Sequence, residues 1–562
     1  MSHRLAAQFC NEVNNAIRNR DSRQLQSILV LEPPFSPIYE QLIAELRNQY
    51  PATDAGSEGR LEEVVRAAVT ETGESEDAEG RPVQSWNAMA NFLAGWLTFI
   101  RDVDTSQLLK AYEAMSDLQS RINTALQHPT KGIIVLDTLI GYAKIFARVA
   151  VGLDRQPELA HHLATASATN GERGESLAEK ATNIIRQAFI TCLNDKNIAP
   201  GGIKNGKPDG KKVAVYEMAN VCLKILFQSN KLDNCSMIFK NIDSASPPLH
   251  FYPARDRVTY LYYLGRYHFI NNEFYHAQSI LQKAYDESPS HESCMKQRRL
   301  ILVYLLTANL ILGRLPTEKV YSRPEAYDFY RIFRPIAEAI RKGDLETFRR
   351  ITNLDLSYEY AAKLCRWRVF YQIGNYCEIL VWRTLFRKVF LLVGQQPGPA
   401  GRAAPTLDLN AVVLAAAYLE RRALMSRSMA QADSGPGRRH IAFAIHDFTN
   451  TPKYVDPDFD GLNLEPYVHT PDMEEIECLC GSLIVQGFVS GYISYKQKKL
   501  AIMGARKAGS AVKAGFPNVW QVIAKRNQEE AGKAEVLGWV KEQNQGGRGR
   551  VVRLTHARPA GS

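Results

Sequence analysis

The sequence predicts an all-α, right-handed helical solenoid that is capped by a small winged-helix domain. From the start of the chain to about residue 393, apolar residues recur on a helical period and no strand-period segment interrupts them. These helices carry no heptad seam, which favours a solenoid of stacked helix pairs over a coiled coil. The first strand-period segment comes at 488–503, directly after a predicted helix.

One complete repeat unit stands at 261–289, LYYLGRYHFINNEFYHAQSILQKAYDESP, and it fits the tetratricopeptide pattern. Gly265 is the small residue that lets two antiparallel helices approach each other, and Ala277 follows at the matching position of the second helix. The loop at 271–273 consists of turn and capping residues, and Pro289 ends the second helix. The unit therefore predicts a TPR-like helix pair.

The predicted elements follow the chain in this order. Amphipathic periodicity and end signals predict helices at 4–31, 37–50, 86–103, 107–126, 132–153, 171–193, 213–228, 232–242 and 255–270. The same signals predict later helices at 295–312, 324–341, 344–352, 358–373, 376–393, 407–424 and 472–486, with caps at Gly343-Asp344 and at Asp472. Strands follow at 491–495 and 500–503, joined by a turn at 496–498.

Composition shifts divide the chain into segments. Low hydrophobicity and excess acidic charge predict a disordered or loosely helical linker at 51–82, and Gly/Pro-rich stretches mark the later loops. The division is helices at 1–50, the acidic flexible linker at 51–82, a helical repeat region at 83–250, a TPR-like part at 251–393, a loop at 394–406, a winged-helix part at 407–505 with an insertion at 425–471, and a basic C-terminal tail at 506–562.

The charge of the chain is concentrated at its C-terminal end. The formal net charge is +10 over 562 residues. Residues 491–562 hold fourteen Lys and Arg against four Glu, so they account for the whole excess. A basic end on a neutral body indicates a polyanionic partner, although a solvated tail has the same composition.

A helix, a second helix and a basic hairpin together predict a winged helix, a fold that often binds nucleic acid and often serves only as a protein interface. Three lysines at the turn, Lys496, Lys498 and Lys499, are placed to reach phosphates without reading bases. The predicted patch continues through Arg506, Lys507, Lys513, Lys525 and Arg526. For each of these residues singly, a solvated surface charge is the simpler interpretation, and their clustering supports the functional one.

Catalytic motifs are not evident in the sequence. Gly201, Gly206 and Lys207 satisfy the GxxxxGK spacing of a phosphate-binding loop, but that loop needs a preceding strand and a Ser or Thr after the lysine. Here Pro208 follows, and the preceding segment reads as a helix. The chain also lacks HExxH and GxSxG patterns. We therefore expect no enzymatic activity, no cofactor and no metal site.

The cysteines and the apolar segments bear on the compartment. Nine cysteines are scattered without a CxxC pair, and Cys478 and Cys480 point to different faces of a predicted helix. They read as core residues of a protein in a reducing compartment. The first residues lack the apolar stretch of a signal peptide, and no apolar run approaches the roughly 20 residues that span a bilayer. We expect an intracellular, soluble protein without membrane insertion.

Four stretches carry a resemblance to a known family: 260–285, 382–394, 407–420 and 473–503. They resemble the PCI-domain subunit of the TREX-2 nuclear mRNA-export complex and its close relative, signalosome subunit 12. The resemblance runs from about 213 to 503 and more weakly through the N-terminal helices, and GYISYKQKKL is its most specific part. The chain departs from the family at two insertions, 395–406 and 425–471.

The resemblance implies a non-catalytic scaffold with the PCI fold, a TPR-like solenoid followed by a winged helix. Its implied partners are a larger PCI-type scaffold subunit, a small acidic disordered subunit shared with the proteasome lid, and RNA and double-stranded DNA. The implied role is transcription elongation and poly(A) mRNA export in the nucleus, including the nuclear pore, with some protein in the cytoplasm. The alternative is a protein-interaction subunit of a COP9 signalosome or proteasome-lid-like complex that binds no nucleic acid.

Overall fold

The computed structural model describes residues 4–33, 35, 37–54, 56–70, 75–76, 82–83, 85–104, 106–156, 176–196, 198–353, 356, 358–396, 403–419, 461–462, 471–531 and 539. Two compact units make up the chain: the first comprises Met1–Tyr263 with Glu535–Ser562, and the second comprises Leu264–Ala534. Their boundary falls within α12 (Ala254–Ile270). The described residues are mostly helical with few strands, as expected for a helical solenoid.

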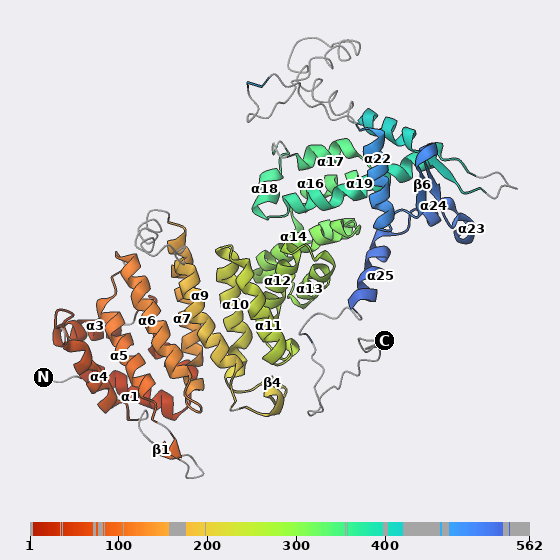
Figure 1. Cartoon of the computed structure of the whole chain (residues 1–562). Helices are drawn as coiled ribbons and strands as arrows, with labels where there is room; N and C mark the ends of the chain where they lie inside the picture. Colours follow the sequence, from red (N-terminus) through yellow and green to blue (C-terminus); the bar gives the residue numbers. More distant parts are fainter. Residues whose placement is uncertain are drawn as a thin grey trace, which may run out of the picture. The chain divides into compact units, whose positions relative to one another are not determined.

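The first unit is an array of helices in which neighbours along the chain pack against each other (Figure 1). Its helices are α1 (Arg4–Arg18), α2 (Ser22–Ile28), α3 (Pro37–Gln49), α4 (Ser57–Ala68), α5 (Asn87–Asp102), α6 (Leu108–Leu126), α7 (Leu136–Asp154), α9 (Leu177–Leu193), α10 (Val215–Gln228) and α11 (Cys235–Ala245). Two antiparallel strand pairs accompany them, β1 (Ser75–Glu76) with β2 (Pro82–Val83) and β3 (Ile203–Lys204) with β4 (Lys207–Pro208). The helix predicted at 4–31 is wrong as a single element, because Arg20 has a φ of 52° and Asp21 caps a second helix, α2. The other predicted helices of this part are confirmed, with ends that differ by a few residues.

Local end signals explain several of these boundaries. Ser176 forms a capping box with Glu179, in which each side chain bonds the other residue's backbone N–H, and this fixes the start of α9. Trp86, fully buried before α5, donates its indole N–H to the carbonyl of Ala125 at 2.9 Å. Buried polar groups need hydrogen-bond partners, and this bond connects the start of α5 to the end of α6.

The predicted acidic linker at 51–82 needs a correction, because it contains α4. Leu61, Val65 and Val69 lie at helical spacing, and all three are buried. Helix α4 packs against α5. The acidic residues of α4 lie away from its buried face, so the average hydrophobicity of the segment is low although the helix is packed. Residues 71–74, 77–81 and 84 of this segment lie outside the described residues.

The loop predicted as exposed at 194–212 is also partly folded. Strands β3 and β4 pair as a tight hairpin, with Lys204 opposite Lys207. Lys211 is buried, and its ammonium donates to the carbonyl of His128 at 3.0 Å. The GxxxxGK residues therefore lie in a hairpin after a helix, α9, rather than in a strand-to-helix phosphate loop.

The helical part of the second unit continues with α13 (Phe274–Glu287), α14 (Met295–Ile311), α15 (Glu318–Tyr321), α16 (Phe329–Lys342), α17 (Leu345–Thr352), α18 (Ala361–Arg366) and α19 (Phe370–Val393). A Cβ atom at Gly265 would lie 2.6 Å from Cγ of Leu281 on α13, so the predicted close approach of the two helices is confirmed. Gly343 adopts a left-handed conformation, and Asp344 caps α17 through the N–H of Thr347, as predicted.

Two predicted helix boundaries in this part are wrong. The helix expected at 324–341 begins only at Phe329, because Asp328 has a φ of 67°. The helices expected at 358–373 and 376–393 are divided at a different place: α18 is short and α19 runs unbroken for 24 residues. Arg368, with a φ of 58°, makes the break, whereas Gly374 is accommodated inside α19.

A three-stranded antiparallel sheet follows, in the order β5 (Thr406–Asp408), β7 (Lys499–Ile502), β6 (Gly491–Ser494). Beside it lie a helix at 409–419 and α22 (Met473–Val485), which starts at the predicted cap Asp472 and ends before Gly487 at a φ of 72°. The hairpin prediction is confirmed. The helix predicted from 407 is wrong at its start, because 406–408 pair with β7. We call the 403–419 and 471–516 residues together the sheet module.

The segment predicted as a basic tail, 506–562, is folded through residue 531. It forms α23 (Ala505–Ala508), α24 (Ala511–Gly515) and α25 (Val519–Ala531). A Cβ at Gly515 would lie 2.7 Å from Cδ1 of Ile502, so α24 packs closely on β7. Trp520 of α25 stacks on Tyr275 of α13 at 5.6 Å. Apart from 539, the rest of the tail lies outside the described residues, as does most of the predicted insertion at 425–471.

Candidate nucleic-acid interface

The predicted lysines of the turn lie between β6 and β7. A single helical turn, Tyr495–Gln497, carries Lys496, and Lys498 follows with a left-handed φ of 52°. The carbonyl of Lys498 accepts the N–H of Leu409 at 2.9 Å, which attaches the turn to the start of the 409–419 helix. Lys496 and Lys498 are exposed. The backbone of the turn is therefore fixed while its two ammonium groups extend into solvent.

Lys499 differs from its two neighbours. It is the first residue of β7, half-buried, and in register with Ser494 on one side and Asp408 on the other. Opposite charges that face each other across a strand pair attract, so the Asp408 carboxylate partly offsets the charge of Lys499. Lys496 and Lys498 are thus the stronger candidates for a phosphate contact.

Two aromatic side chains accompany these lysines on the same hairpin. Tyr492 on β6 is 53% exposed and Tyr495 in the turn is 67% exposed. Exposed aromatic rings next to cations can stack on unpaired bases while the ammonium groups contact phosphates. The tyrosines were not among the predicted contacts, although the alternation in GYISYKQ places Tyr492 on the outer face of the strand.

The predicted residues beyond the hairpin fall into two places. Arg506 and Lys507 lie on α23 between Gly504 and Gly509, which both have positive φ, and Lys513 lies on α24. All three side chains are exposed. Figure 1 shows α23 and α24 beside β6, so these cations belong to the same module as the turn.

Lys525 and Arg526 lie on α25, which packs against α13. The Arg526 guanidinium donates to the carbonyl of Gln486 at 3.2 Å, at the C-terminal end of α22. Cations at a helix C-terminus satisfy unpaired carbonyls and complement the helix dipole. Arg526 therefore has a structural role, and the structure does not place it beside the turn lysines.

A second group of cations was missed by the sequence analysis. It comprises Arg334, Arg341 and Lys342 on α16 with Arg387 and Lys388 on α19. We call these five residues the α16–α19 basic surface. The spacing of the three α16 residues places them on one face of a helix, and this pattern could have been read from the sequence. The contact between α16 and α19, which adds the other two cations, depends on the fold.

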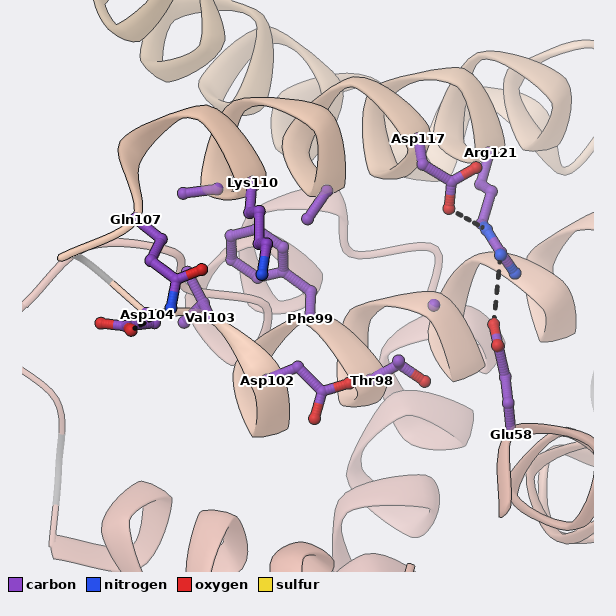
Figure 2. Close-up of a pocket in the computed structure, with 13 residues that line it drawn as sticks. Glu58, Thr98, Phe99, Asp102, Val103, Asp104, Gln107, Lys110, Asp117 and Arg121 are labelled. Carbon is purple, nitrogen blue, oxygen red and sulfur yellow. Dashed lines mark hydrogen bonds and ion pairs between the residues drawn. The ribbon is translucent and has the colours of Figure 1, made fainter. Parts of the chain in front are cut away.

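A pocket of about 440 Å³ lies in the first unit between α4, α5 and α6 (Figure 2). Carboxylates at Glu58, Asp102, Asp104 and Asp117 surround it, together with Lys110 and Arg121. Arg121 is held by Asp117 at 2.7 Å and by Glu58 at 3.2 Å, as the dashed lines in Figure 2 mark.

The chemistry of this pocket is that of ion pairs. Hydrogen bonds from the side chain and backbone of Ser106 lower the pKa of Asp104, so this carboxylate stays ionised at neutral pH. Neither histidine nor cysteine is among the described residues that line the pocket. Within the described part of the chain, no group of three or more His, Cys, Asp or Glu is arranged to hold a metal ion.

The chain is similar to several PCI domain-containing proteins. No family model matches it. A PCI domain-containing protein of Schizosaccharomyces pombe is 24% identical over 496 residues, which cover 88% of this chain and 92% of that protein. PCI domain-containing protein 2 of Xenopus laevis is 26% identical over 332 residues, 59% of this chain and 64% of that protein. A CSN12 homolog of Neurospora crassa is 24% identical over 329 residues, 58% of this chain and 59% of that protein.

These homologues are PCI domain-containing proteins, which supports the PCI family that the sequence resembles. The chain spans less than two thirds of the Xenopus and Neurospora proteins. In the described residues, no helix combines the length and apolar character needed to cross a membrane.

Proposed function

We propose that this chain is a non-catalytic scaffold subunit of a PCI complex and that it binds RNA and double-stranded DNA through its sheet module. In this proposal the 409–419 helix, α22 and the β5–β7–β6 sheet form a winged helix, and the β6–β7 turn is its wing. The relatives support the scaffold role through their PCI domains. The observation that carries the nucleic-acid role is the fixed turn with two exposed lysines, Lys496 and Lys498.

The proposed setting is nuclear. The four stretches that resemble the TREX-2 subunit favour a complex that acts in transcription elongation and poly(A) mRNA export. A larger PCI-type subunit and a small acidic disordered subunit are the proposed protein partners. Co-purification is the experiment that tests these partners.

The second candidate is a protein-interaction subunit without nucleic-acid binding. Exposed apolar side chains on the sheet module favour it: Leu414 and Tyr418, one turn apart on the 409–419 helix, are 71% and 63% exposed. Such a face suits a second subunit. The two candidates differ in whether the exposed cations contact a polyanion and in the complex that the chain would join.

The test replaces turn lysines and measures binding to a fluorescent 30-base-pair duplex and a 30-nucleotide RNA at several salt concentrations. We expect the Lys496→Glu, Lys498→Glu, Lys499→Glu variant to weaken both about equally and to flatten the salt dependence. The slope should fall by up to about 0.9 for each duplex phosphate that the variant no longer neutralises, because each neutralised phosphate releases counterions. Assembly with the scaffold subunit should survive, since Lys496 and Lys498 lie on an exposed turn and Lys499 on the strand that follows it.

In the triple variant, Glu at position 499 would face Asp408 across the strands, and the repulsion between the two carboxylates could disturb the sheet. The Lys496→Glu, Lys498→Glu double variant avoids this repulsion, so a loss of binding in it cannot be due to a disturbed sheet. The matched control is Lys204→Glu, Lys207→Glu, which makes the same charge change on the exposed β3–β4 hairpin. Binding and slope equal to the parent in the double and triple variants would remove the nucleic-acid role and leave the second candidate.

A further inference from the structure

The α16–α19 basic surface is built on one face of α16. Arg334, Glu338, Arg341 and Lys342 follow one another at helical spacing on that helix. The Glu338 carboxylate accepts from Arg334 at 2.8 Å and from Lys342 at 3.0 Å. The bond from Lys342 has the larger effect and that from Arg334 the next, and together they lower the pKa of Glu338 to about 2. A single carboxylate is thus shared by two cations, and the face keeps a positive charge.

Two of the cations have no carboxylate partner in the part of the chain that the structure describes. Arg341 on α16 and Arg387 on α19 are exposed and make neither an ion pair nor a side-chain hydrogen bond there. Lys388, next to Arg387, donates only to the carbonyl of Lys342, at 3.3 Å. That bond brings the cations of α19 beside those of α16.

The surface continues to the sheet module through Arg383. This residue lies one turn before Arg387 on α19, and its guanidinium donates to the carbonyls of Phe488, at 3.1 Å, and Pro517, at 2.5 Å. Burial and, second, the like charge of Arg387 lower the pKa of Arg383 to about 10. Two arginines one helical turn apart repel each other when no anion lies near them. The cationic region therefore reaches from α16 across α19 to the loops of the sheet module, all in one compact unit.

We propose that the α16–α19 basic surface is a second phosphate-contact site, which extends the nucleic-acid interface from the sheet module onto the helical part of the same unit. This inference rests on the proposed nucleic-acid function. The ligand is a polyanion with regularly spaced charges, because the cations are spread over two helices rather than gathered round one point.

Nucleic acid fits this surface better than an acidic protein does. Between Arg334 and Lys342, the side chains of the α16 face that are not buried are charged except for the half-buried Pro335. One turn earlier, the exposed Tyr330 ring lies 4.5 Å from the Arg334 guanidinium. The core of a protein interface is depleted in charge and enriched in aromatic residues, whereas a phosphate backbone needs cations alone. The bond from Arg383 to Phe488 joins this surface to the module that carries the exposed lysines, which favours the same ligand.

The experiment compares the full-length Arg341→Glu, Arg387→Glu variant with the parent, by fluorescence anisotropy on the same duplex and RNA. Both substituted side chains are exposed and unpaired in the described structure, so circular dichroism and Tm should match the parent. We expect weaker binding to both ligands and a salt slope lower by up to about 1.8, from about 0.9 for each of two duplex contacts. Arg341→Gln, Arg387→Gln should show a smaller loss of the same kind.

The control is Lys296→Glu, Lys319→Glu, which makes the same charge change at exposed sites of the same unit. It should bind as the parent does, which excludes a general effect of net charge. If the Arg341, Arg387 variant also binds as the parent while the Lys496, Lys498 variant does not, the inference is wrong and the proposed function stands. If the parent binds neither ligand, both are wrong. Loss of poly-glutamate binding with nucleic-acid binding intact would assign the surface to an acidic protein and overturn the inference.

Discussion

Gly265 shows how one residue sets the distance between two helices. The side chain of Leu281 occupies the space into which a Cβ at position 265 would project, at 2.6 Å from Cγ. Glycine in a helix interior costs up to about 1 kcal/mol relative to alanine. The close packing of α12 on Leu281 offsets that cost, because a buried interface excludes solvent and gains dispersion contacts.

We expect Gly265→Leu to lower the free energy of unfolding by roughly 1–3 kcal/mol or more, because it overpacks this contact. Urea denaturation would measure it. Gly481→Ala on α22 is the matched control: a Cβ there meets nothing within 4 Å, so the variant should be neutral or more stable by up to about 1 kcal/mol. Equal stability of the Gly265 variant and the parent would show that the two helices can separate without cost.

Arg298 and Glu325 form a buried ion pair that joins α14 to the segment before α16. Their side chains are 8% and 4% exposed, and Arg298 Nε lies 3.0 Å from Glu325 Oε1. The hydroxyl of Tyr285 also donates to this carboxylate, and the Arg298 guanidinium lies 4.1 Å from the centre of the Tyr285 ring. Burial alone disfavours the charged carboxylate, but the hydrogen bonds from Tyr285 and Arg298 outweigh it and lower the pKa of Glu325.

A lowered folded-state pKa makes this pair sensitive to acid. Its contribution is present above the unfolded pKa of about 4.3 and is lost as the pH falls through the folded value. We expect Glu325→Gln to lower the free energy of unfolding at pH 7 by about 3–5 kcal/mol, since it leaves Arg298 buried without a counter-charge. The difference in Tm between variant and parent should shrink below about pH 4. A difference that stays constant from pH 7 to pH 3 would contradict this account.

At the scale of elements, α4 is the clearest case of a helix hidden by composition. Its sequence, SEGRLEEVVRAA, is rich in acid, yet Leu61 and Val65 are buried. A flexible linker would tolerate any substitution there, whereas a packed helix would not.

We expect Leu61→Ala to lower the free energy of unfolding by about 2–5 kcal/mol, because it opens a cavity against α5. Glu63→Ala, on the exposed face of the same helix, should change it by less than about 0.5 kcal/mol. Chemical denaturation of both variants is the measurement. If both leave stability unchanged, α4 contributes nothing to the packed unit.

For the whole molecule, the two proposed functions predict different sets of co-purifying proteins. A scaffold of the mRNA-export type should co-purify with one larger PCI-type subunit and one small acidic subunit. Mass spectrometry of the tagged full chain would identify them, and the Lys496→Glu, Lys498→Glu variant should bring down the same proteins. Recovery of a set of signalosome or proteasome-lid subunits instead would favour the protein-interaction alternative.

Much of the helical architecture could be predicted because its signals are local. Apolar residues repeat every turn within one segment, and a cap acts on its own helix, as Asp344, Gly343 and Asp472 do. The close approach at Gly265 was predictable for the same reason, since both helices lie in one short stretch. The lysines at the β6–β7 turn were predictable because the hairpin that exposes them is continuous in sequence.

The remaining features depend on residues that are distant in sequence and meet only in the folded chain. Strand β5 reads as the start of a helix, and its pairing with β7 decides otherwise. Arg526 reads as one more charge in a basic tail until the end of α22 is placed beside it. The α16–α19 basic surface likewise exists only because Lys388 reaches the last carbonyl of α16. The sequence predicts most of the helical segments and the place where charge accumulates, since both are properties of short stretches. Tertiary structure alone decided which charges are used in packing and which stay exposed, because that depends on the partners each side chain meets.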